Sequence, residues 1–594
     1  MDLKIYVVYR KDKITSLIIY SVLTPYFRMI EGSYASGKSA FPLKGMTLGE
    51  MLEDIASKYP DIEAVVSVHQ NIRWTYREFL KQVHDVARGL MGLGVEKGDR
   101  VGIWVMNHAE WLVIQYATAK IGAIMVNINP SYRTYELEYV LKQAEIQTII
   151  IQGRFKTSDY VGMFYEACPE AFEAKPGRIS SEKFPFLKNA VFIGNIPYNG
   201  MFTWEELLKK AEEITDDELV ARSDALSFDD AINIQYTSGT TGFPKGVVLT
   251  HHSVLNNGKI IGDGMGFTEK DRLCIPVPFY HCFGMVLSSL ASVTHGSTMV
   301  LPTPAFDAEE VLKTVEKEQC TALNGVPTMF IAELAHPNFK KYNLKSLRTG
   351  IMAGSPCPIE VMKQVNTKMH MSEIVIVYGQ TETSPGVTMT TTQDPVERRV
   401  STIGRAFPHT ELKIIDPKSG KIVPLGEIGE ICARGYCVMK CYYNNPSATR
   451  ATLDSNHWNH TGDLGTMDEK GYFRIVGRLK DMVIRGGENI YPREIEEFLH
   501  HHEKITDVYV VGVPDRKYGE ELCAWVKVKD SQQLTDQDVK DFCKGKIAHY
   551  KIPRYLIFVH DFPMSVSGKI QKFRMREESV RILGLHEEEK IETA

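Results

Sequence analysis

Helix and strand patterns alternate along most of this chain, and this alternation constrains its fold more than any other feature. Residues 100–105 form an apolar run typical of a buried strand, and Ala109–Ile121 has the spacing of a helix that follows it. The theme recurs at 135–151 and, after a less regular stretch at 155–203, at 231–325. Repeated strand–helix units predict a parallel sheet that helices cover on both faces. We therefore expect an α/β fold.

The later part of the chain predicts a different style of structure. Short segments after residue 400 read as strands separated by turn residues, which is typical of an antiparallel annex. After Arg478 a compact mixture of helices and strands follows. We expect an N-terminal extension or targeting segment at 1–46, a large domain of layered strand–helix sheets with a β annex at 47–479, and a small α+β C-terminal domain at 480–594.

Composition excludes several classes of protein. The 594 residues are 43% hydrophobic and 24% charged, which is ordinary for a globular protein and excludes wholesale disorder and a polytopic membrane protein. Lys and Arg number 69 against 74 Asp and Glu, so the net charge is −5. Because this charge forms no blocks of one sign, we expect no nucleic-acid partner.

The ten cysteines show no tight pairing, which fits a reduced compartment better than a disulfide scaffold. Cys432, Cys437 and Cys441 have His457 and His460 nearby in the sequence. Their spacing is not that of paired zinc ligands, so the sequence gives little support for a zinc site.

The first forty residues have a character of their own. They hold six basic and three acidic residues, a net charge of +3. Their apolar run at 14–27 is shorter than the ~20 residues that a membrane span needs, so we expect no transmembrane anchor. Three interpretations stay open: the apolar part of a secretory signal, a mitochondrial presequence that contains acids, and a dispensable, weakly ordered tail.

Residues 32–39 match the phosphate-loop pattern of P-loop NTPases. Such a loop needs a buried strand before it and a helix after it, whose amides hold the phosphates. Here Pro42 stands where that helix would continue, and the residues before Gly32 form a weak strand at best. We interpret this match as accidental.

The strongest chemical signal is the segment 236–247, which follows the predicted strand at 231–235. It reads Tyr-Thr-Ser-Gly-Thr-Thr-Gly-Phe-Pro-Lys-Gly-Val. Its glycines let the backbone approach a ligand closely, and its hydroxyls and amides can surround polyphosphate oxygens. Lys245 adds a charged donor. A polar hairpin loop rarely combines these features, so we predict a nucleotide phosphate site.

Four further segments suit a nucleotide, although each is weak alone. Segment 377–383 follows an apolar strand, where open α/β sheets bind ligands, and it offers Thr381 to a phosphate and Glu382 to Mg²⁺. Asp463, in Thr-Gly-Asp-Leu, suits two ribose hydroxyls. The remaining segments are 477–492, rich in Gly and Arg, and 563–570, a glycine-containing turn that carries Lys569.

The order of these five motifs resembles that of the AMP-forming adenylate superfamily, which includes acyl-CoA synthetases, luciferases and peptide-synthetase adenylation domains. The resemblance spans roughly residues 47 to 578, and segments 435–439, 542–547 and 567–573 look most like the medium-chain acyl-CoA ligases. It implies an ATP-dependent, AMP-forming fatty acid–CoA ligase that works through an acyl-adenylate. An aromatic-acid CoA ligase, or another adenylate-forming enzyme on the same scaffold, is the alternative.

The resemblance also implies a role for individual residues. Lys569, Glu382, Thr381 and His281 would be catalytic, with Glu382 on Mg²⁺ and His281 lining the acyl site. ATP would contact Thr237, Ser238, Gly239, Thr240, Thr241, Gly242, Phe243, Pro244, Lys245, Gly354, Ser355, Pro356, Tyr378, Gly379, Asp463, Arg478 and Lys569. Lys480 would be the hinge about which a mobile C-terminal domain turns, although relatives carry Asp there, and Arg485, Gly486 and Gly487 would face CoA.

ATP, Mg²⁺ and CoA are thus the implied cofactor and co-substrates, and a carboxylic acid is the substrate. The sequence does not indicate an oligomeric state. By resemblance the location would be mitochondrial, and otherwise cytoplasmic.

Overall fold

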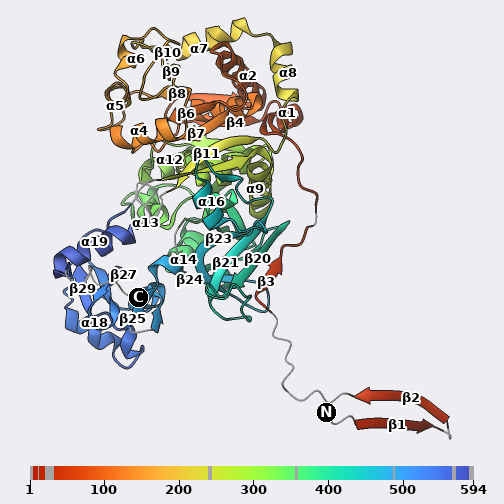
Figure 1. Ribbon diagram of the computed structural model, residues 1–594, viewed down its shortest axis with the longest axis vertical. Helices are drawn as coiled ribbons and strands as arrows, with labels where there is room; N and C mark the ends of the chain where they lie inside the picture. Colours follow the sequence, from red (N-terminus) through yellow and green to blue (C-terminus); the bar gives the residue numbers. More distant parts are fainter. Residues whose placement is uncertain are drawn as a thin grey trace.

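Sheet A forms the upper layer of the large domain (Figure 1), and its central strands are parallel. The computed structural model describes residues 4–10, 13–20, 32–39, 41–237, 244–354, 357, 359–485, 488–564 and 570–586. In spatial order sheet A contains β10 (Phe202–Thr203), β9 (Asn189–Phe192), β8 (Thr148–Ile151), β6 (Arg100–Trp104), β7 (Ile124–Asn127), β11 (Ala231–Thr237), β12 (Lys245–Thr250) and β22 (Cys441–Tyr442). The strands β11, β12 and β22 pair antiparallel at one edge.

Sheet B is the second layer and is also parallel from β4 to β17. Its order is β19 (Arg405–Ala406), β18 (Gly386–Met389), β17 (Glu373–Gly379), β16 (Thr349–Met352), β15 (Ala322–Leu323), β13 (Arg272–Cys274), β14 (Thr298–Leu301), β4 (Glu63–Ser67) and β5 (Ile72–Thr75). The runs at Thr148–Ile151 and Thr298–Leu301 are buried throughout, as parallel strands with two covered faces should be.

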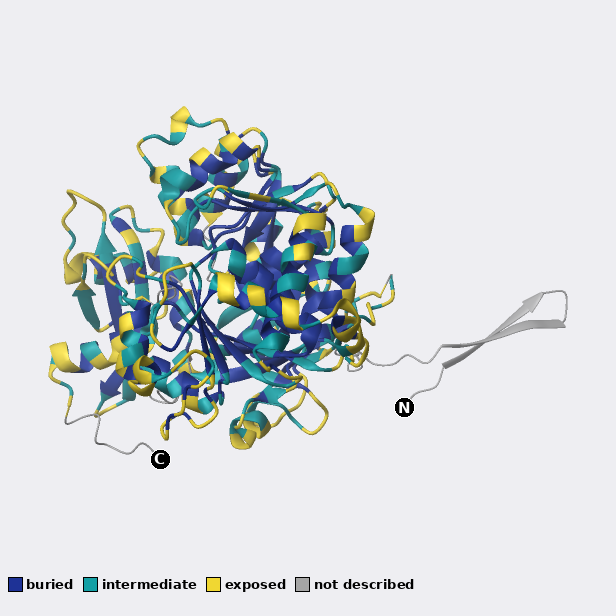
Figure 2. Cartoon of the chain, turned by 90° about the horizontal axis from the view of Figure 1, so that it is seen from above, coloured by how far each residue is buried: buried dark blue, intermediate teal, exposed yellow. Residues whose placement is uncertain are grey.

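Two helices of the large domain are buried over most of their length. Every residue of α3 (Ala109–Ile121) except Glu110 is buried, and α9 (His251–Met265) is largely buried as well. They form one core with Val101 of sheet A and Leu273 of sheet B. Figure 2 shows this buried interior between exposed helix faces.

The outer helices are amphipathic and several begin at an N-cap threonine. Thr47 and Thr75 each form a capping box with the Glu three residues later, which fixes the starts of α1 and α2. The other longer helices of the large domain, in chain order, are α1 (Leu48–Lys58), α2 (Tyr76–Gly92), α4 (Thr134–Gln143), α5 (Tyr160–Ala167), α6 (Glu170–Glu173), α7 (Trp204–Lys210), α8 (Asp216–Asp224), α12 (Ala308–Glu318), α13 (Pro327–Ala335), α14 (Ile359–Lys368), α15 (Val396–Ser401) and α16 (Pro446–Thr452).

Sheet C is the antiparallel annex, and Figure 1 shows it below the α/β layers. Its order is β24 (Phe473–Arg478), β23 (Asn459–Met467), β21 (Gly429–Gly435), β20 (Thr410–Ile415) and β3 (Tyr34–Ser36). Because residues 34–36 form an edge strand here, and the first helix after them starts only at Leu48, the phosphate-loop pattern at 32–39 does not form a strand–loop–helix unit.

The C-terminal domain is built on sheet D, which lies beside the annex in Figure 1. Sheet D contains β26 (Glu488–Ile490), β25 (Val483–Arg485), β28 (Gly519–Val528) and β27 (Ile505–Asp515), and β29 (Tyr555–Phe558) pairs with β28. Its helices are α17 (Pro492–Leu499), α18 (Asp536–Cys543) and α19 (Lys572–Leu583). The α/β fold class, with a large first domain and a small second one, is confirmed.

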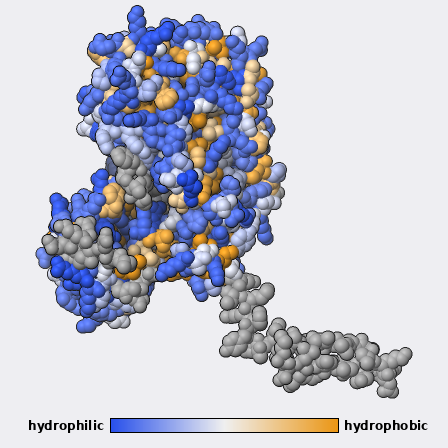
Figure 3. All heavy atoms as spheres, viewed as in Figure 1, coloured by the Kyte–Doolittle hydropathy of each residue, from blue (hydrophilic) through white to orange (hydrophobic). Residues whose placement is uncertain are grey.

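Two stretches that looked irregular in the sequence contain regular elements. Strands β1 (Lys4–Arg10) and β2 (Lys13–Tyr20) pair antiparallel, and the role of residues 1–46 as an extension or targeting segment stays a prediction. Between 155 and 203, helix α5 and strand β9 extend the α/β pattern. None of the helices in the described part of the chain has the length and apolar character that a membrane crossing requires. On the face drawn in Figure 3, hydrophilic residues cover most of the described surface.

Candidate active site

Strands from sheets A, B and C meet at one place, and each brings one of the predicted motifs. Thr237 ends β11 in sheet A, directly across from Lys245 at the start of β12. Gly379 ends β17 in sheet B, and a short 3₁₀ turn, η4 (Thr381–Thr383), follows it. Asp463 lies on β23 of sheet C. The carboxyl ends of parallel strands are where α/β sheets bind ligands, so this junction is the candidate site.

The two described ends of the predicted phosphate segment pair where β11 ends and β12 begins. Of the residues from 237 to 245 that we expected to contact ATP, the described ones are Thr237, Pro244 and Lys245. The carbonyl of Pro244 accepts a hydrogen bond from the Tyr139 hydroxyl at 3.0 Å. Six predicted members of the segment lie outside the described residues: Ser238, Gly239, Thr240, Thr241, Gly242 and Phe243. The hairpin therefore places Lys245 at the site.

Asp463 is the best-connected acid of the site. Its Oδ2 accepts hydrogen bonds from the Tyr378 hydroxyl at 2.8 Å and from Nε2 of Gln380 at 2.9 Å, and its Oδ1 pairs with Nε of Arg478 at 2.9 Å. The Asp463 side chain is 7% exposed, whereas that of Arg478 is 51% exposed. Asp463 raises the pKa of the Arg478 guanidinium, which therefore stays charged. The structure thus joins the second, third and fourth motifs through one carboxylate.

Glu382 and Lys245 meet through a residue that no motif contains. The Tyr442 hydroxyl donates to Oε1 of Glu382 at 2.6 Å, and the Lys245 ammonium lies 4.1 Å from the centre of the Tyr442 ring. Burial and the Glu382 charge raise the pKa of Tyr442, which keeps its hydroxyl a donor. Tyr442 sits on β22, the edge strand that pairs with β12, which carries Lys245.

The predicted adenine-framing residues flank this junction in sheet B. Burial raises the pKa of Tyr378 well above its usual value, so its hydroxyl is also a donor. A Cβ on Gly379 would lie 1.7 Å from the Pro385 carbonyl oxygen, so only glycine fits where β17 meets β18. Gly354 follows β16 with a φ of +93°, and Ser355 and Pro356 lie outside the described residues.

Lys480 lies in the turn η5 (Leu479–Asp481), which connects β24 of the annex to β25 of sheet D. Burial lowers the pKa of its ammonium, and the charges of Arg478 and Lys245 lower it further. The predicted hinge residue is therefore electrostatically coupled to the site as well as being placed between the domains.

The residues predicted to face CoA lie on the first hairpin of sheet D. Nε of Arg485 pairs with Oε1 of Glu521 at 2.7 Å, and its guanidinium lies over the Tyr518 ring. Gly486, Gly487 and Lys569 lie outside the described residues. The described structure therefore leaves the contacts of Lys569 and of the two glycines as predictions.

His281 begins the short helix α10 (Cys282–Gly284), with its Nδ1 accepting from the Phe283 amide at 3.1 Å. A buried asparagine fixes the segment before it. Asn107 donates to the Val277 carbonyl at 2.9 Å and accepts from the Phe279 amide at 2.9 Å. The π-helix η2 (Met285–Leu290) follows, and π-turns are frequent at functional sites.

Sequence reasoning missed three residues of this arrangement: Gln380, Tyr442 and Asn107. Gln380 stands inside a motif that we quoted, but only the fold shows that its amide reaches Asp463 and the Thr461 carbonyl. Tyr442 and Asn107 each form a hydrogen bond with a residue more than fifty positions away in the sequence. The residues next to them in the sequence form no motif that indicates a site. The arrangement can hold a polyphosphate on Lys245, a metal ion on Glu382 and a ribose on Asp463.

Two family models match the chain. The model for the AMP-binding enzyme covers residues 52–443, and the model for the AMP-binding enzyme C-terminal domain covers residues 494–569. These ranges include the hairpin of Lys245, the Glu382 turn and, at its last position, Lys569.

Individual relatives agree with these matches. The chain is 54% identical over 539 residues to YngI of Bacillus subtilis (strain 168), which is named as an acyl-CoA synthetase, covering 91% of this chain and 98% of the relative. It is 43% identical to the mitochondrial medium-chain acyl-CoA ligase ACSF2 of Danio rerio, covering 94% and 93%. Among solved structures, the anthranilate CoA ligase AuaEII in complex with anthranoyl-AMP matches with a TM-score of 0.79 at 26% identity, covering 92% of this chain and 99% of that one.

Proposed function

The chain belongs to the family of AMP-binding enzymes and is an ATP-dependent, AMP-forming acyl-CoA ligase, and we propose that the acid it activates is a medium-chain fatty acid. Enzymes of this family use ATP, Mg²⁺ and CoA. In the first step a carboxylate oxygen bonds to the α-phosphorus of ATP and pyrophosphate leaves. In the second step the CoA sulfur bonds to the acyl carbon and AMP leaves.

The observation that carries the proposed substrate is the apolar character of the segments around His281. We infer that the acyl chain lies along 279–285, 328–330 and 350–354, which contain no Lys, Arg, Asp or Glu. Within them Phe279, Met285 and Met352 are buried. An uncharged lining suits a hydrocarbon chain and offers no partner to a second carboxylate, and methionines adapt their shape to flexible chains. The relative from Danio rerio, with its medium-chain name, supports the same choice.

In the first step both reacting groups are negative, so the site must neutralise them and hold them in line. We assign the β- and γ-phosphates to the Lys245 hairpin, the α-phosphate to Thr381 and the ribose to Asp463 and Arg478. Lys569 would place its ammonium between the carboxylate and the α-phosphate. If so, Lys569→Ala should abolish acid-dependent exchange of pyrophosphate into ATP while ATP still binds.

Glu382 is the residue that we assign to Mg²⁺. Its Oε1 accepts the Tyr442 hydroxyl at 2.6 Å, so the carboxylate is oriented before a metal ion arrives. When bound, Mg²⁺ neutralises phosphate charge and stabilises the leaving pyrophosphate. Tyr442 thus serves as the support for the carboxylate and as the platform for Lys245.

For the second step we propose that the C-terminal domain turns about Lys480. This movement would withdraw Lys569 and bring the hairpin of Arg485 towards the thiol. The ion pair of Arg485 with the buried Glu521 holds the base of that hairpin within its own domain, so it would move as a unit.

An aromatic acid is the alternative substrate, and the anthranilate ligase with its anthranoyl-AMP supports it. The test is CoA-dependent AMP release with saturated acids from C4 to C18, benzoate and coumarate at equal concentrations. We expect the highest kcat/KM between C6 and C12 and little turnover of benzoate. Activity only on aromatic acids would overturn the fatty-acid proposal.

A mitochondrial location is a further proposal, because the relative from Danio rerio is named as mitochondrial. Residues 1–46 fused to a fluorescent protein would enter mitochondria of a eukaryotic cell if they act as a presequence. Uniform fluorescence throughout the cell would contradict this.

A further inference from the structure

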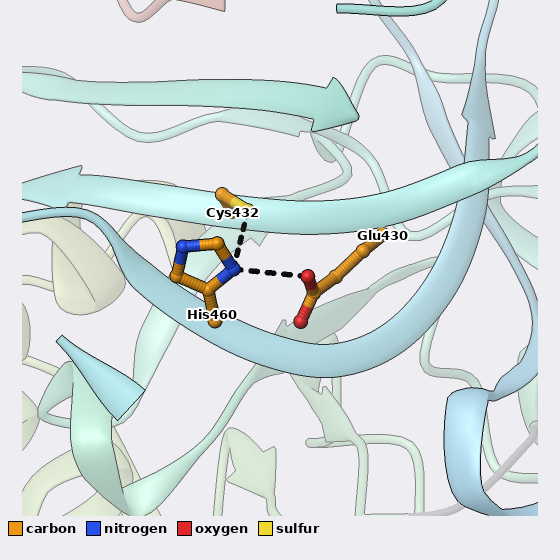
Figure 4. A group of neighbouring side chains, drawn as sticks. All are labelled: Glu430, Cys432 and His460. Atoms are coloured by element: carbon orange, nitrogen blue, oxygen red, sulfur yellow. Dashed lines mark hydrogen bonds and ion pairs between the residues drawn. The ribbon is translucent and has the colours of Figure 1, made fainter. Parts of the chain in front are cut away.

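Three side chains of different chemistry meet on one face of sheet C, next to the Thr461–Leu464 motif. Glu430 and Cys432 stand two residues apart on β21, so they point to the same side of the sheet. His460 on β23 is the direct cross-strand partner of Cys432. Figure 4 shows the three side chains facing one another. The register of two antiparallel strands therefore builds the group, which is why no sequence motif revealed it.

The donor atoms have nearly the separations that one metal ion requires. Nδ1 of His460 lies 2.9 Å from Oε2 of Glu430 and 3.6 Å from Sγ of Cys432, and all three donor atoms lie within 4.8 Å of one another. A tetrahedral ion with bonds of about 2.0 Å to N or O and 2.3 Å to S holds its S and N ligands roughly 3.5 Å apart and its N and O ligands roughly 3.3 Å apart. The S–N pair already has this separation, and the O–N pair needs only a small opening.

Outer contacts orient each side chain as metal ligands are commonly oriented. The second ring nitrogen of His460, Nε2, lies 3.9 Å from Oδ2 of Asp454, which places a carboxylate behind the histidine. The other oxygen of Glu430, Oε1, accepts the Gly462 amide at 3.0 Å. Cys432 packs with Ile415 and Trp458, which supply an apolar wall. Thiolate, imidazole and carboxylate together are the ligand set of zinc-like ions rather than of Mg²⁺.

The local charge also suits a divalent cation. Cys432 is fully buried and Glu430 is 7% exposed, whereas the His460 side chain is 30% exposed. Glu430, Asp454 and a Cys432 thiolate would provide three negative charges. Of the nearby cations, Lys413 and Arg434 both stack on the Trp458 ring, and Arg434 also pairs with Glu411.

We propose that Glu430, Cys432 and His460 form a binding site for one thiophilic divalent transition metal ion of the zinc class, with water as the fourth ligand on the exposed side of His460. On binding, the ion bonds to Oε2, Sγ and Nδ1, and the thiol proton and any proton on Nδ1 pass to solvent, with no change in oxidation state. The Gly462 amide links this site to Asp463, one residue further along β23. The proposed site is therefore connected through the backbone to the acid that we assign to the ribose.

The test is titration of the untagged, reduced full-length chain with Co²⁺ in the presence of excess Mg²⁺. We expect one Co²⁺ per chain with a thiolate-to-cobalt charge-transfer band and tetrahedral d–d bands, both displaced by one equivalent of Zn²⁺. The run His500–His502 could also take up Co²⁺, but it contains no thiol and gives no thiolate band.

Variants locate the site. Cys432→Ser and His460→Gln should each abolish the thiolate band, because each removes a ligand. The matched controls Cys441→Ser and His457→Gln change the same residue types outside the group and should keep it. A wild-type chain without the band, or a band that survives Cys432→Ser or disappears equally in Cys441→Ser, would overturn the proposal. These readouts need no turnover, so they do not depend on which acid is the substrate.

Discussion

The Tyr442 hydroxyl donates a 2.6 Å hydrogen bond to Glu382, while the Lys245 ammonium lies 4.1 Å from the centre of the same Tyr442 ring. One side chain therefore links the carboxylate that we assign to Mg²⁺ with the lysine that we assign to the phosphates. Edge strand β22 brings it there, so the antiparallel end of sheet A has a direct role in the site.

Tyr442→Phe should weaken Mg²⁺ binding at Glu382 while the ring still supports Lys245. The variant keeps the ring but loses a hydrogen bond to a charged group, which is typically worth about 1.5–3 kcal/mol. We expect acid-dependent pyrophosphate exchange to fall about tenfold or more, with a higher half-saturating Mg²⁺ concentration. Tyr443→Phe, which removes a hydroxyl contact to Glu145 instead, is the control and should have little effect. Equal losses in both variants would contradict the assigned role.

Asp463→Asn should reduce ATP affinity. The substitution preserves size but removes the charge that Arg478 pairs with and that holds the Tyr378 hydroxyl and the Gln380 amide. Charge-assisted bonds of this kind support a loss of about tenfold or more in the KM for ATP. Asp468→Asn breaks the exposed ion pair with Arg398 and is the matched control. An unchanged KM in Asp463→Asn would rule out a ribose contact there.

Gly379→Ala should damage adenylation because its Cβ would lie 1.7 Å from the Pro385 carbonyl oxygen. Relief of such overpacking typically costs about 1–3 kcal/mol, and here it would shift the turn that carries Glu382. We expect a fall in acid-dependent pyrophosphate exchange of roughly 10- to 100-fold. Gly153→Ala would meet only the Phe192 ring, at an ordinary contact distance of 3.6 Å, and should retain activity. A fully active Gly379→Ala would show that the β17 end does not fix the site.

Asn107→Ala should weaken binding of the carboxylic acid substrate more than binding of ATP. It leaves the Phe279 amide and the Val277 carbonyl without their partner just before His281. Each buried group left unsatisfied costs about 1–3 kcal/mol, so thermal unfolding should occur at a lower temperature and the KM for the acid should rise. The exposed Asn195→Ala should change neither. A rise in the KM for ATP without one for the acid would place Asn107 elsewhere in the mechanism.

Low pH should destabilise the large domain, because histidines that are buried in the folded chain become protonated when it unfolds. Burial lowers the pKa of His251 to about 3, and its Nδ1 accepts the Leu48 amide at the start of α1. The unfolded chain binds this proton below a pKa of about 6.5 but the folded chain only below about 3, so between these values stability falls as pH falls.

The contribution of His251 is roughly 1.4 kcal/mol per pH unit in that window. His251→Asn can still accept the Leu48 amide but does not titrate, so the free energy of unfolding from urea titrations at pH 7 to 5 should fall less steeply than in the wild type. His69 and His108, whose pKa values burial lowers to about 4, preserve part of the slope. The exposed His586→Asn should match the wild type. Identical slopes in wild type and His251→Asn would contradict this account.

The regular α/β units were predictable because each has its own periodicity. The expected helices Leu48–Lys58 and Ala109–Ile121 have the bounds seen in the structure. The expected strand at 231–235 continues to Thr237 because β12 pairs with its end. Strand β12 and edge strand β22 were not predicted. Strand β22 pairs with β12 from far along the chain, so no local pattern specifies it.

The site residues likewise divide into those that a local motif predicts and those that only the fold brings together. Lys245, Glu382, Asp463 and Arg478 stand in local motifs, and the structure brings them together. Tyr442 and the group of Glu430, Cys432 and His460 depend on strand register, and Asn107 depends on contacts with residues far along the chain, so only the folded chain reveals them.

A reaction without CoA separates the two chemical steps of the enzyme. The full chain, at a concentration close to that of ATP, is mixed with Mg²⁺ and octanoate, and the products are identified by mass spectrometry before and after CoA is added. The account predicts enzyme-bound octanoyl-adenylate with one equivalent of pyrophosphate first, then octanoyl-CoA and AMP when CoA arrives. ADP and phosphate as products, or octanoate left unreacted while benzoate or coumarate forms the adenylate, would contradict it.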